Sequence, residues 1–215
     1  MKLVITRPEH DITTRYISTW AEEIISFAQS KKIDVIDLAG EKANKNDFEG
    51  RVNKLQPKAI LLNGHGSDDC ICGHNDEILI KAGDNHKFLQ GKITYALSCS
   101  SGKKLGPEVV EDEKSVYIGY DDDFIFVTDH RYVGRPAEDP KAKPFMESSN
   151  QVMLSLLKGN TAKEASDKSK NKFIENVRSM STSIADPDTL QAAQCLWWDM
   201  RHQVCLGDGN ATVNN

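Results

Sequence analysis

The chain has 215 residues, of which 39% are hydrophobic and 27% are charged, an ordinary composition for one globular domain with a sizeable core. Its net charge of −5 argues against nucleic acid or an anionic membrane surface as a partner. No segment has the character of a signal peptide or a membrane span. The five cysteines are odd in number and lack disulfide-framework spacing, which predicts reduced thiols and a cytoplasmic location.

Residues 1–130 alternate between short apolar runs and stretches with helical periodicity. The predicted strands cover residues 3–5, 33–38, 58–63, 92–98 and 115–119. The predicted helices cover residues 11–30, with Asp11 as a candidate cap, and residues 46–55. The run at 58–63 shows no polar alternation, so we expect that strand to be buried on both faces.

This alternation predicts an α/β fold in which right-handed crossovers build a mostly parallel sheet with helices on both faces. A long acidic loop follows over residues 120–144, and loops of this length are usually functional or mobile. The last third of the chain has helical periodicity in three segments, which cover residues 145–158, 161–180 and 187–206.

These elements predict one domain over residues 1–206, with its core in residues 1–130 and a helical part in residues 145–206. The polar tail over residues 207–215 is expected to be disordered. The sequence leaves the oligomeric state open.

Two of the predicted strands end in a reactive side chain. The apolar run at 60–62 leads to His65, which lies between two glycines, Gly64 and Gly66. The run at 93–97 leads to Cys99, which has serines on both sides. Because ligands bind beyond the carboxyl ends of the strands in parallel sheets, we expect the imidazole and the thiol at the same edge.

A thiol with an imidazole beside it can act as a nucleophile, because the imidazole can serve as the base that removes the thiol proton. Taken singly, a cysteine at a strand end is more often a small buried hydrophobe, and a histidine among glycines is more often a turn residue. Their occurrence on successive strand ends favours a catalytic pair, Cys99 and His65. The backbone amides of Gly66 and Cys99 are then the natural donors to an oxyanion.

The segments 60–67 and 93–102 resemble the two signature blocks of the caspase-like cysteine peptidases of clan CD, which include caspases, gingipains, clostripain and the CHAT domains. The resemblance implies a caspase-like three-layer sandwich with His65 and Cys99 as catalytic dyad, and with the amides of Gly66 and Cys99 as oxyanion site. The short gap between His65 and Cys99 is more similar to gingipains and CHAT domains than to animal caspases. The caspase sequence Gln-Ala-Cys-x-Gly is absent, and the resemblance covers roughly residues 1–130.

Three consecutive carboxylates, Asp121, Asp122 and Asp123, follow the last predicted strand at the same edge. In the family that the chain resembles, side chains at this place shape the pocket for the residue before the scissile bond. An acidic pocket there would select Lys or Arg, because a partly buried anion needs a cation. A solvated acidic turn is an equal alternative, and a calcium site is a third.

Two further groups of polar residues lie just after His65. Cys70, Cys72 and His74 offer three zinc ligands, but a structural site needs four, so a loop beside the active site is the preferred interpretation and no metal is predicted. The second nitrogen of His65 would suit a carboxylate partner, and Asp68, Asp69 and Asp76 are the candidates. Nothing in their spacing selects one of them, so a simple dyad is expected.

The function expected from these features is that of a cysteine endopeptidase that needs no cofactor and acts on a protein or peptide. A catalytically silent interaction or signalling module on the same scaffold is the alternative, because fold alone does not prove chemistry. A flavodoxin-like nucleotide-binding domain is a third possibility, and it would bind its ligand without any dependence on a thiol.

Overall fold

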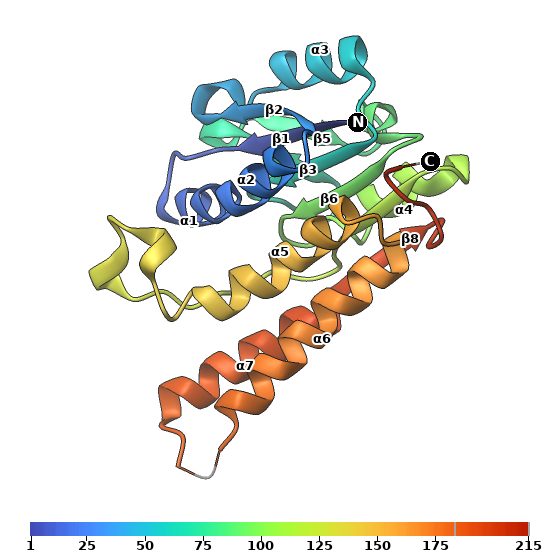
Figure 1. The fold of residues 1–215 in the computed structure, drawn as a ribbon. Helices are drawn as coiled ribbons and strands as arrows, with labels where there is room; N and C mark the ends of the chain where they lie inside the picture. The colour runs from blue at the N-terminus through green and yellow to red at the C-terminus, as the bar shows by residue number, and fades with distance from the viewer. Residues whose placement is uncertain (183, 215) are drawn as a thin grey trace.

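A six-stranded sheet forms the centre of the fold (Figure 1). The structure is a computed structural model, and it describes residues 1–182 and 184–214. Its strands are β1 (Lys2–Arg7), β2 (Asp34–Ala39), β3 (Ala59–Asn63), β6 (Ile93–Leu97), β7 (Val116–Tyr120) and β8 (Gln203–Gly207). They lie in the order β2-β1-β3-β6-β7-β8. All neighbouring strands are parallel except β8, which runs antiparallel to β7.

Helices cover both faces of this sheet. The helices are α1 (Ile12–Trp20), α2 (Glu22–Ser30), α3 (Lys45–Leu55), α4 (Leu105–Val109), α5 (Lys143–Leu157), α6 (Ala162–Met180) and α7 (Pro187–His202). Helices α1, α2 and α5 pack on one face and α3 and α4 on the other. The predicted α/β fold is therefore confirmed, and the arrangement is consistent with a caspase-like three-layer sandwich.

Alternate side chains of each central strand enter opposite hydrophobic clusters. In β3, Leu61 joins the cluster under α1, α2 and α5, whereas Ile60 and Leu62 join the cluster under α3 and α4. Every residue of β3 is buried, as its uninterrupted apolar run predicted. Burial on both faces leaves the ends of the strands as the places where this sheet presents side chains to a ligand.

The predicted first helix is divided in two. Asp11 caps α1, as expected, because its side chain accepts a hydrogen bond from the backbone amide of Thr14. Ala21 then separates α1 from α2, although it retains a helical conformation and its amide still bonds to Ile17 at 3.1 Å. Both halves bury their apolar faces against the same side of the sheet.

A small hairpin lies in the segment after His65, where no strand was predicted. It consists of β4 (Cys70–Cys72) and β5 (Ile78–Lys81), which pair antiparallel. Ile71 and Ile80 of the hairpin are fully buried in the cluster under α3 and α4. The hairpin forms because these two apolar side chains have a core to enter, although the polar residues around them obscure the strand pattern.

The carboxyl-terminal part differs from the prediction in two ways. Helix α7 ends at His202, and residues 203–207 form β8, because the backbone of Val204 and Cys205 pairs with β7 and completes the sheet. The tail was expected to be disordered, but Val213 is only 2% exposed and the carbonyl of Ala211 accepts a hydrogen bond from the amide of Ala162. These contacts order residues 208–214, and residue 215 lies outside the described residues.

Helices α6 and α7 form a long antiparallel hairpin that extends beyond the sheet (Figure 1). Phe145 of α5, Phe173 of α6 and Leu196 of α7 are fully buried in a separate apolar cluster, which holds the hairpin against the domain. Among the described residues, no helix combines the length and hydrophobicity needed to cross a bilayer.

The long loop after β7 is anchored at several points. The carboxylate of Asp139, which is fully buried, accepts hydrogen bonds from the hydroxyl group of Tyr16 and from the amide of Asp129, both at 2.8 Å. Trp20 donates its indole N–H to the carbonyl of Pro136 at 3.0 Å. The loop is thus fastened to α1.

Candidate active site

The strand register brings the His65 and Cys99 segments to the same edge of the sheet. Asn63 and Leu97 are paired residues at the carboxyl ends of β3 and β6. His65 and Cys99 each follow two positions later, so they leave the sheet side by side. Both line a cleft of about 490 Å³, together with Gly66, Asp123 and neighbouring residues of α1 and of the segment 124–128.

Gly66 is the point where the two segments touch. A Cβ atom at this position would lie 2.7 Å from the carbonyl oxygen of Cys99 and 3.0 Å from the Cβ of Ser98. These distances are too short for any side chain, so glycine is needed for the backbone of one strand end to approach the other. The backbone of Gly66 is consequently in close contact with the backbone of Cys99.

The histidine loop is also fixed from its other side. Gly64 has a φ of +152°, and a Cβ there would lie 2.1 Å from the carbonyl oxygen of Cys72. The amide of Cys72 donates to the carbonyl of His65 at 2.8 Å, and the amide of Gly64 donates to the carbonyl of Leu97 at 3.3 Å. His65 is therefore clamped between the β4–β5 hairpin and β6, which limits its backbone movement.

Asp11 is the carboxylate partner of His65. Its Oδ2 atom lies 2.6 Å from Nε2 of His65, while its Oδ1 atom accepts the capping bond from the Thr14 amide at 2.7 Å. Burial opposes ionisation, yet the hydrogen bonds from His65 and Thr14 lower the pKa of Asp11 to about 2. Since an ionised carboxylate can only accept, Nε2 carries the proton and Nδ1 of a neutral His65 keeps its lone pair.

This contact was not predicted. Asp68, Asp69 and Asp76 were the candidates, and Asp11 was expected only to cap a helix. Asp11 and His65 are 54 residues apart, and the crossover from β1 through α1 and β2 separates them in the chain. The spacing of residues along the chain does not indicate this contact. The strand order does, because Asp11 follows β1 and His65 follows β3, and these two strands are neighbours in the sheet.

The Cys99 thiol is partly buried and lines the cleft. Burial raises its pKa, and the carboxylate of Asp123 acts in the same direction. Its sulfur atom lies 4.0 Å from the carbonyl oxygen of Phe124. The thiol is therefore protonated at neutral pH in this structure, and a nucleophilic role would need a base to remove its proton.

The residues around Cys99 are held by an unusual backbone turn. Ser100 has a φ of +57°, a left-handed conformation that is costly for a residue other than glycine. Its amide bonds to the carbonyl of Asp122 at 3.0 Å. Ser101 is fully buried and receives a hydrogen bond from the hydroxyl group of Tyr117 at 2.8 Å. These hydrogen bonds thus hold the backbone next to Cys99 in a fixed conformation.

The three predicted pocket carboxylates have different surroundings. Asp123 lines the cleft with Cys99. Asp121 instead pairs with His202 of α7, at 2.8 Å between its Oδ1 and the imidazole Nδ1, and the Asp122 side chain accepts from the amide of Asp123. Of the three, Asp123 is the carboxylate that the structure brings to the cleft.

A buried carboxyl group, Asp199 of α7, lies behind the wall of the cleft. Its Oδ1 atom accepts a hydrogen bond from the amide of Ile125 at 2.9 Å, and its Oδ2 atom has no partner among the described residues. Burial raises the pKa of Asp199 well above the usual range of a carboxyl group. The sequence placed this residue within an expected helix but gave no sign that it supports the segment 124–128.

Cys70 and Cys72, which were predicted to lie in a loop with His74, instead form strand β4, and His74 lies in the turn that follows it. Burial and the neighbouring Cys70 raise the pKa of Cys72 to about 12, so this thiol is protonated at neutral pH. The Nδ1 atom of His74 accepts a hydrogen bond from the amide of Glu9 at 3.3 Å. All five cysteines lie within the described residues, and none of them forms a disulfide.

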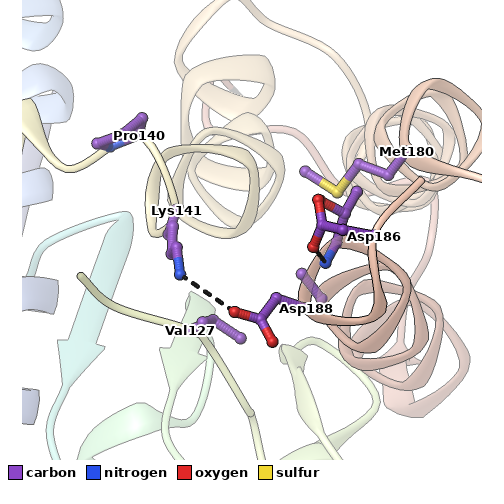
Figure 2. A pocket seen from close by; sticks show the side chains of 8 residues that line it. Val127, Pro140, Lys141, Met180, Asp186 and Asp188 are labelled. Carbon is purple, nitrogen blue, oxygen red and sulfur yellow. Dashed lines mark hydrogen bonds and ion pairs between the residues drawn. The ribbon is translucent and has the colours of Figure 1, made fainter. Parts of the chain in front are cut away.

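A second cavity of about 430 Å³ lies between the long loop and the start of α7 (Figure 2). Lys141 and Asp188 face each other across it, 3.9 Å apart, and Asp186, Val127 and Met180 contribute to its walls. Its lining contains neither a thiol nor an imidazole, so the Cys99 cleft is the stronger candidate for a reaction site.

Comparison of the chain with protein-family models gives no match, and comparison with the curated proteins gives none either. The fold and the cleft together describe an α/β sandwich with a thiol, an oriented imidazole and a glycine at the carboxyl edge of its sheet. The function is therefore inferred from this geometry.

Proposed function

We propose that the protein is a cysteine endopeptidase that hydrolyses peptide bonds with Cys99 as nucleophile and His65 as base. The observation that carries this proposal is the shared cleft of His65, Gly66 and Cys99, in which Asp11 orients the imidazole. An oriented base beside a protonated thiol is the arrangement that nucleophilic catalysis by cysteine needs.

In the proposed reaction, the Cys99 sulfur attacks the carbonyl carbon of the scissile bond and its proton passes to Nδ1 of His65. The amides of Gly66 and Cys99 donate hydrogen bonds to the resulting oxyanion. The intermediate collapses when the carbon–nitrogen bond breaks, and the imidazolium protonates the leaving amine. Water, deprotonated by His65, then attacks the thioester, which releases the acid and restores the thiol.

The proposed substrate is a protein or peptide with a basic residue before the scissile bond. Asp123 supports this specificity, because its carboxylate lines the cleft beside Cys99 and would pair with a lysine or arginine side chain. The free thiols of all five cysteines support a reducing compartment such as the cytoplasm as the site of action.

Activity-based labelling tests the proposal. Peptidyl acyloxymethyl ketones that end in Arg or Lys should label the protein, and mass spectrometry should locate the adduct on Cys99. The Cys99→Ala variant should lose the label, whereas the Cys195→Ala variant, which removes a thiol outside the cleft, should keep it. Equal labelling by Asp-ending and Arg-ending probes would contradict the basic specificity.

A silent interaction module is the second candidate function. The raised pKa of Cys99, which burial causes, favours it, since a thiol that stays protonated is a poor nucleophile. Failure of all probes to label a folded protein over a broad set of peptide sequences would support this candidate against the peptidase.

A further inference from the structure

A cluster of imidazole and carboxylate groups lies beside the cleft, on the side of His65 that faces Asp11. His10, His65 and Asp76 each offer one ligand atom, and these atoms all lie within 4.8 Å of one another. They come from three separate segments, namely the loop after β1, the loop after β3 and the turn before β5. The fold, and not a local motif, assembles this cluster.

The distances within the cluster suit a single small cation. Nε2 of His10 lies 3.2 Å from Oδ1 of Asp76, and the ring centroids of His10 and His65 are 5.9 Å apart. Asp11 adds a second carboxylate, because its Oδ2 atom lies 2.6 Å from Nε2 of His65 and 4.0 Å from Nε2 of His10. Two imidazoles and two carboxylates form a four-ligand set of the kind that zinc accepts.

The local charge and polarity favour a cation as well. With neutral imidazoles, the carboxylates of Asp11 and Asp76 leave two negative charges, which one divalent cation would balance. The side chain of His10, whose Nε2 atom belongs to the cluster, is only 12% exposed.

We propose that His10, His65 and Asp76, with Asp11 as fourth ligand, bind one Zn²⁺ ion, and that this ion switches off His65 as a base. The second half rests on the proposed function, whereas the binding itself does not. Without metal, Asp11 holds the proton of His65 on Nε2, and Nδ1 keeps the lone pair that accepts a proton in the proposed reaction. Zinc takes the lone pair of Nε2, so the ring proton moves to Nδ1, and His65 then has no atom that accepts a proton from Cys99.

The zinc site built from these four side chains and the change of tautomer at His65 can be measured separately. Magnesium is not expected to substitute, because imidazole nitrogens suit zinc far better than they suit magnesium.

Calorimetric titration of the full chain with Zn²⁺ tests the site. One ion per chain should bind, and the His10→Ala and Asp76→Asn variants should each weaken binding at least tenfold. The His130→Ala variant removes a histidine whose side chain is 94% exposed and lies outside the cluster, so it should bind like the original chain. Cys99→Ala and the double variant Cys70→Ser, Cys72→Ser should also retain the affinity. Unchanged binding in His10→Ala, loss of binding in the cysteine variants, or no binding at all would overturn the inference.

Nitrogen NMR of the imidazoles and alkylation of Cys99 test the switch. Zinc should move the His65 proton from Nε2 to Nδ1 and should slow Cys99 alkylation several-fold in the original chain but not in His10→Ala. If the chain hydrolyses peptides, zinc should inhibit it, and His10→Ala should resist this inhibition relative to its own metal-free rate. Zinc binding without any peptidase activity would leave the site intact and contradict the proposed function, whereas peptidase activity without zinc binding would contradict this inference alone.

Discussion

The carboxylate of Asp11 joins the start of α1 to the imidazole of His65: one oxygen caps the helix, and the other lies 2.6 Å from Nε2. Asparagine caps helices about as well as aspartate, so Asp11→Asn separates the two roles. We expect this variant to change the free energy of unfolding by less than about 1 kcal/mol. Its kcat should fall by a factor on the order of 10² or more with KM little changed, because the tautomer of His65 is no longer fixed.

Steady-state kinetics with the best peptide substrate and thermal unfolding of the same preparations check this prediction. The variant Asp186→Asn is the matched control, since it makes the same exchange at the cap of α7, outside the cleft. A kcat that stays at the original value in Asp11→Asn would show that Asp11 acts only as a helix cap.

Gly66→Ala should disable the cleft through a clash of a single methyl group. The added Cβ would lie 2.7 Å from the Cys99 carbonyl oxygen, so the two strand ends must separate and the oxyanion donors move apart. We expect at least a tenfold slower labelling of Cys99 and a lower melting temperature. The control is Gly50→Ala in α3, where nothing lies within 4 Å of the new atom. That variant should label normally and gain about 0.5–1 kcal/mol in stability, and equal behaviour of the two variants would refute the close approach.

Asp199 should make the fold less stable as the pH rises. Because burial raises its pKa in the folded state, the folded chain binds a proton that the unfolded chain releases above its ordinary pKa of about 4. The stabilisation is complete below that pH and is lost as the pH rises through the folded-state pKa. The Asp199→Asn variant lacks this titration, so its stability relative to the original chain should increase by up to about 1.4 kcal/mol per pH unit across that window.

Urea unfolding of both chains at several pH values from 4 upward gives this difference directly. Asp188→Asn, which changes an exposed aspartate near the start of the same helix, is the control and should track the original chain. Parallel stability curves for Asp199→Asn and the original chain would show that Asp199 ionises normally.

Alkylation of Cys99 should report a thiol that is hard to ionise. Burial and Asp123 raise its pKa, so the rate with iodoacetamide should still be increasing above pH 8.5, the ordinary pKa of cysteine. The Asp123→Asn variant should shift the rate profile to lower pH, because it removes one negative charge beside the thiol. A profile that levels off near pH 7 in the original chain would instead indicate a thiolate already paired with His65.

The sequence predicts those parts of the fold in which the local pattern of apolar residues matches their burial in the folded chain. The apolar runs of β3 and β6 are buried on both faces, and the small residues after them mark where each strand leaves the sheet. His65, Gly66 and Cys99 could be predicted as neighbours for the same reason, since their spacing from the strand ends determines their place at the edge.

The remainder depends on contacts that local pattern does not report. Residues 203–207 follow a helix without a break and become a strand only because the edge of β7 is available for pairing. The polar tail is ordered by one buried valine, Val213, and by its contacts with the start of α6. The partner of His65 lies in a loop after a different strand, so strand order, and not spacing, determines it.

The wall of the cleft depends on residues near the end of the chain. Helix α7 holds the segment after β7 through Asp121 with His202, the Asp123 carbonyl with Trp198, and the Ile125 amide with Asp199. During synthesis, His65 and Cys99 emerge from the ribosome long before these supports do. A nascent chain therefore carries both reactive groups without the surface that would position a substrate, and the cleft takes its final shape only after α7 has been made and docked.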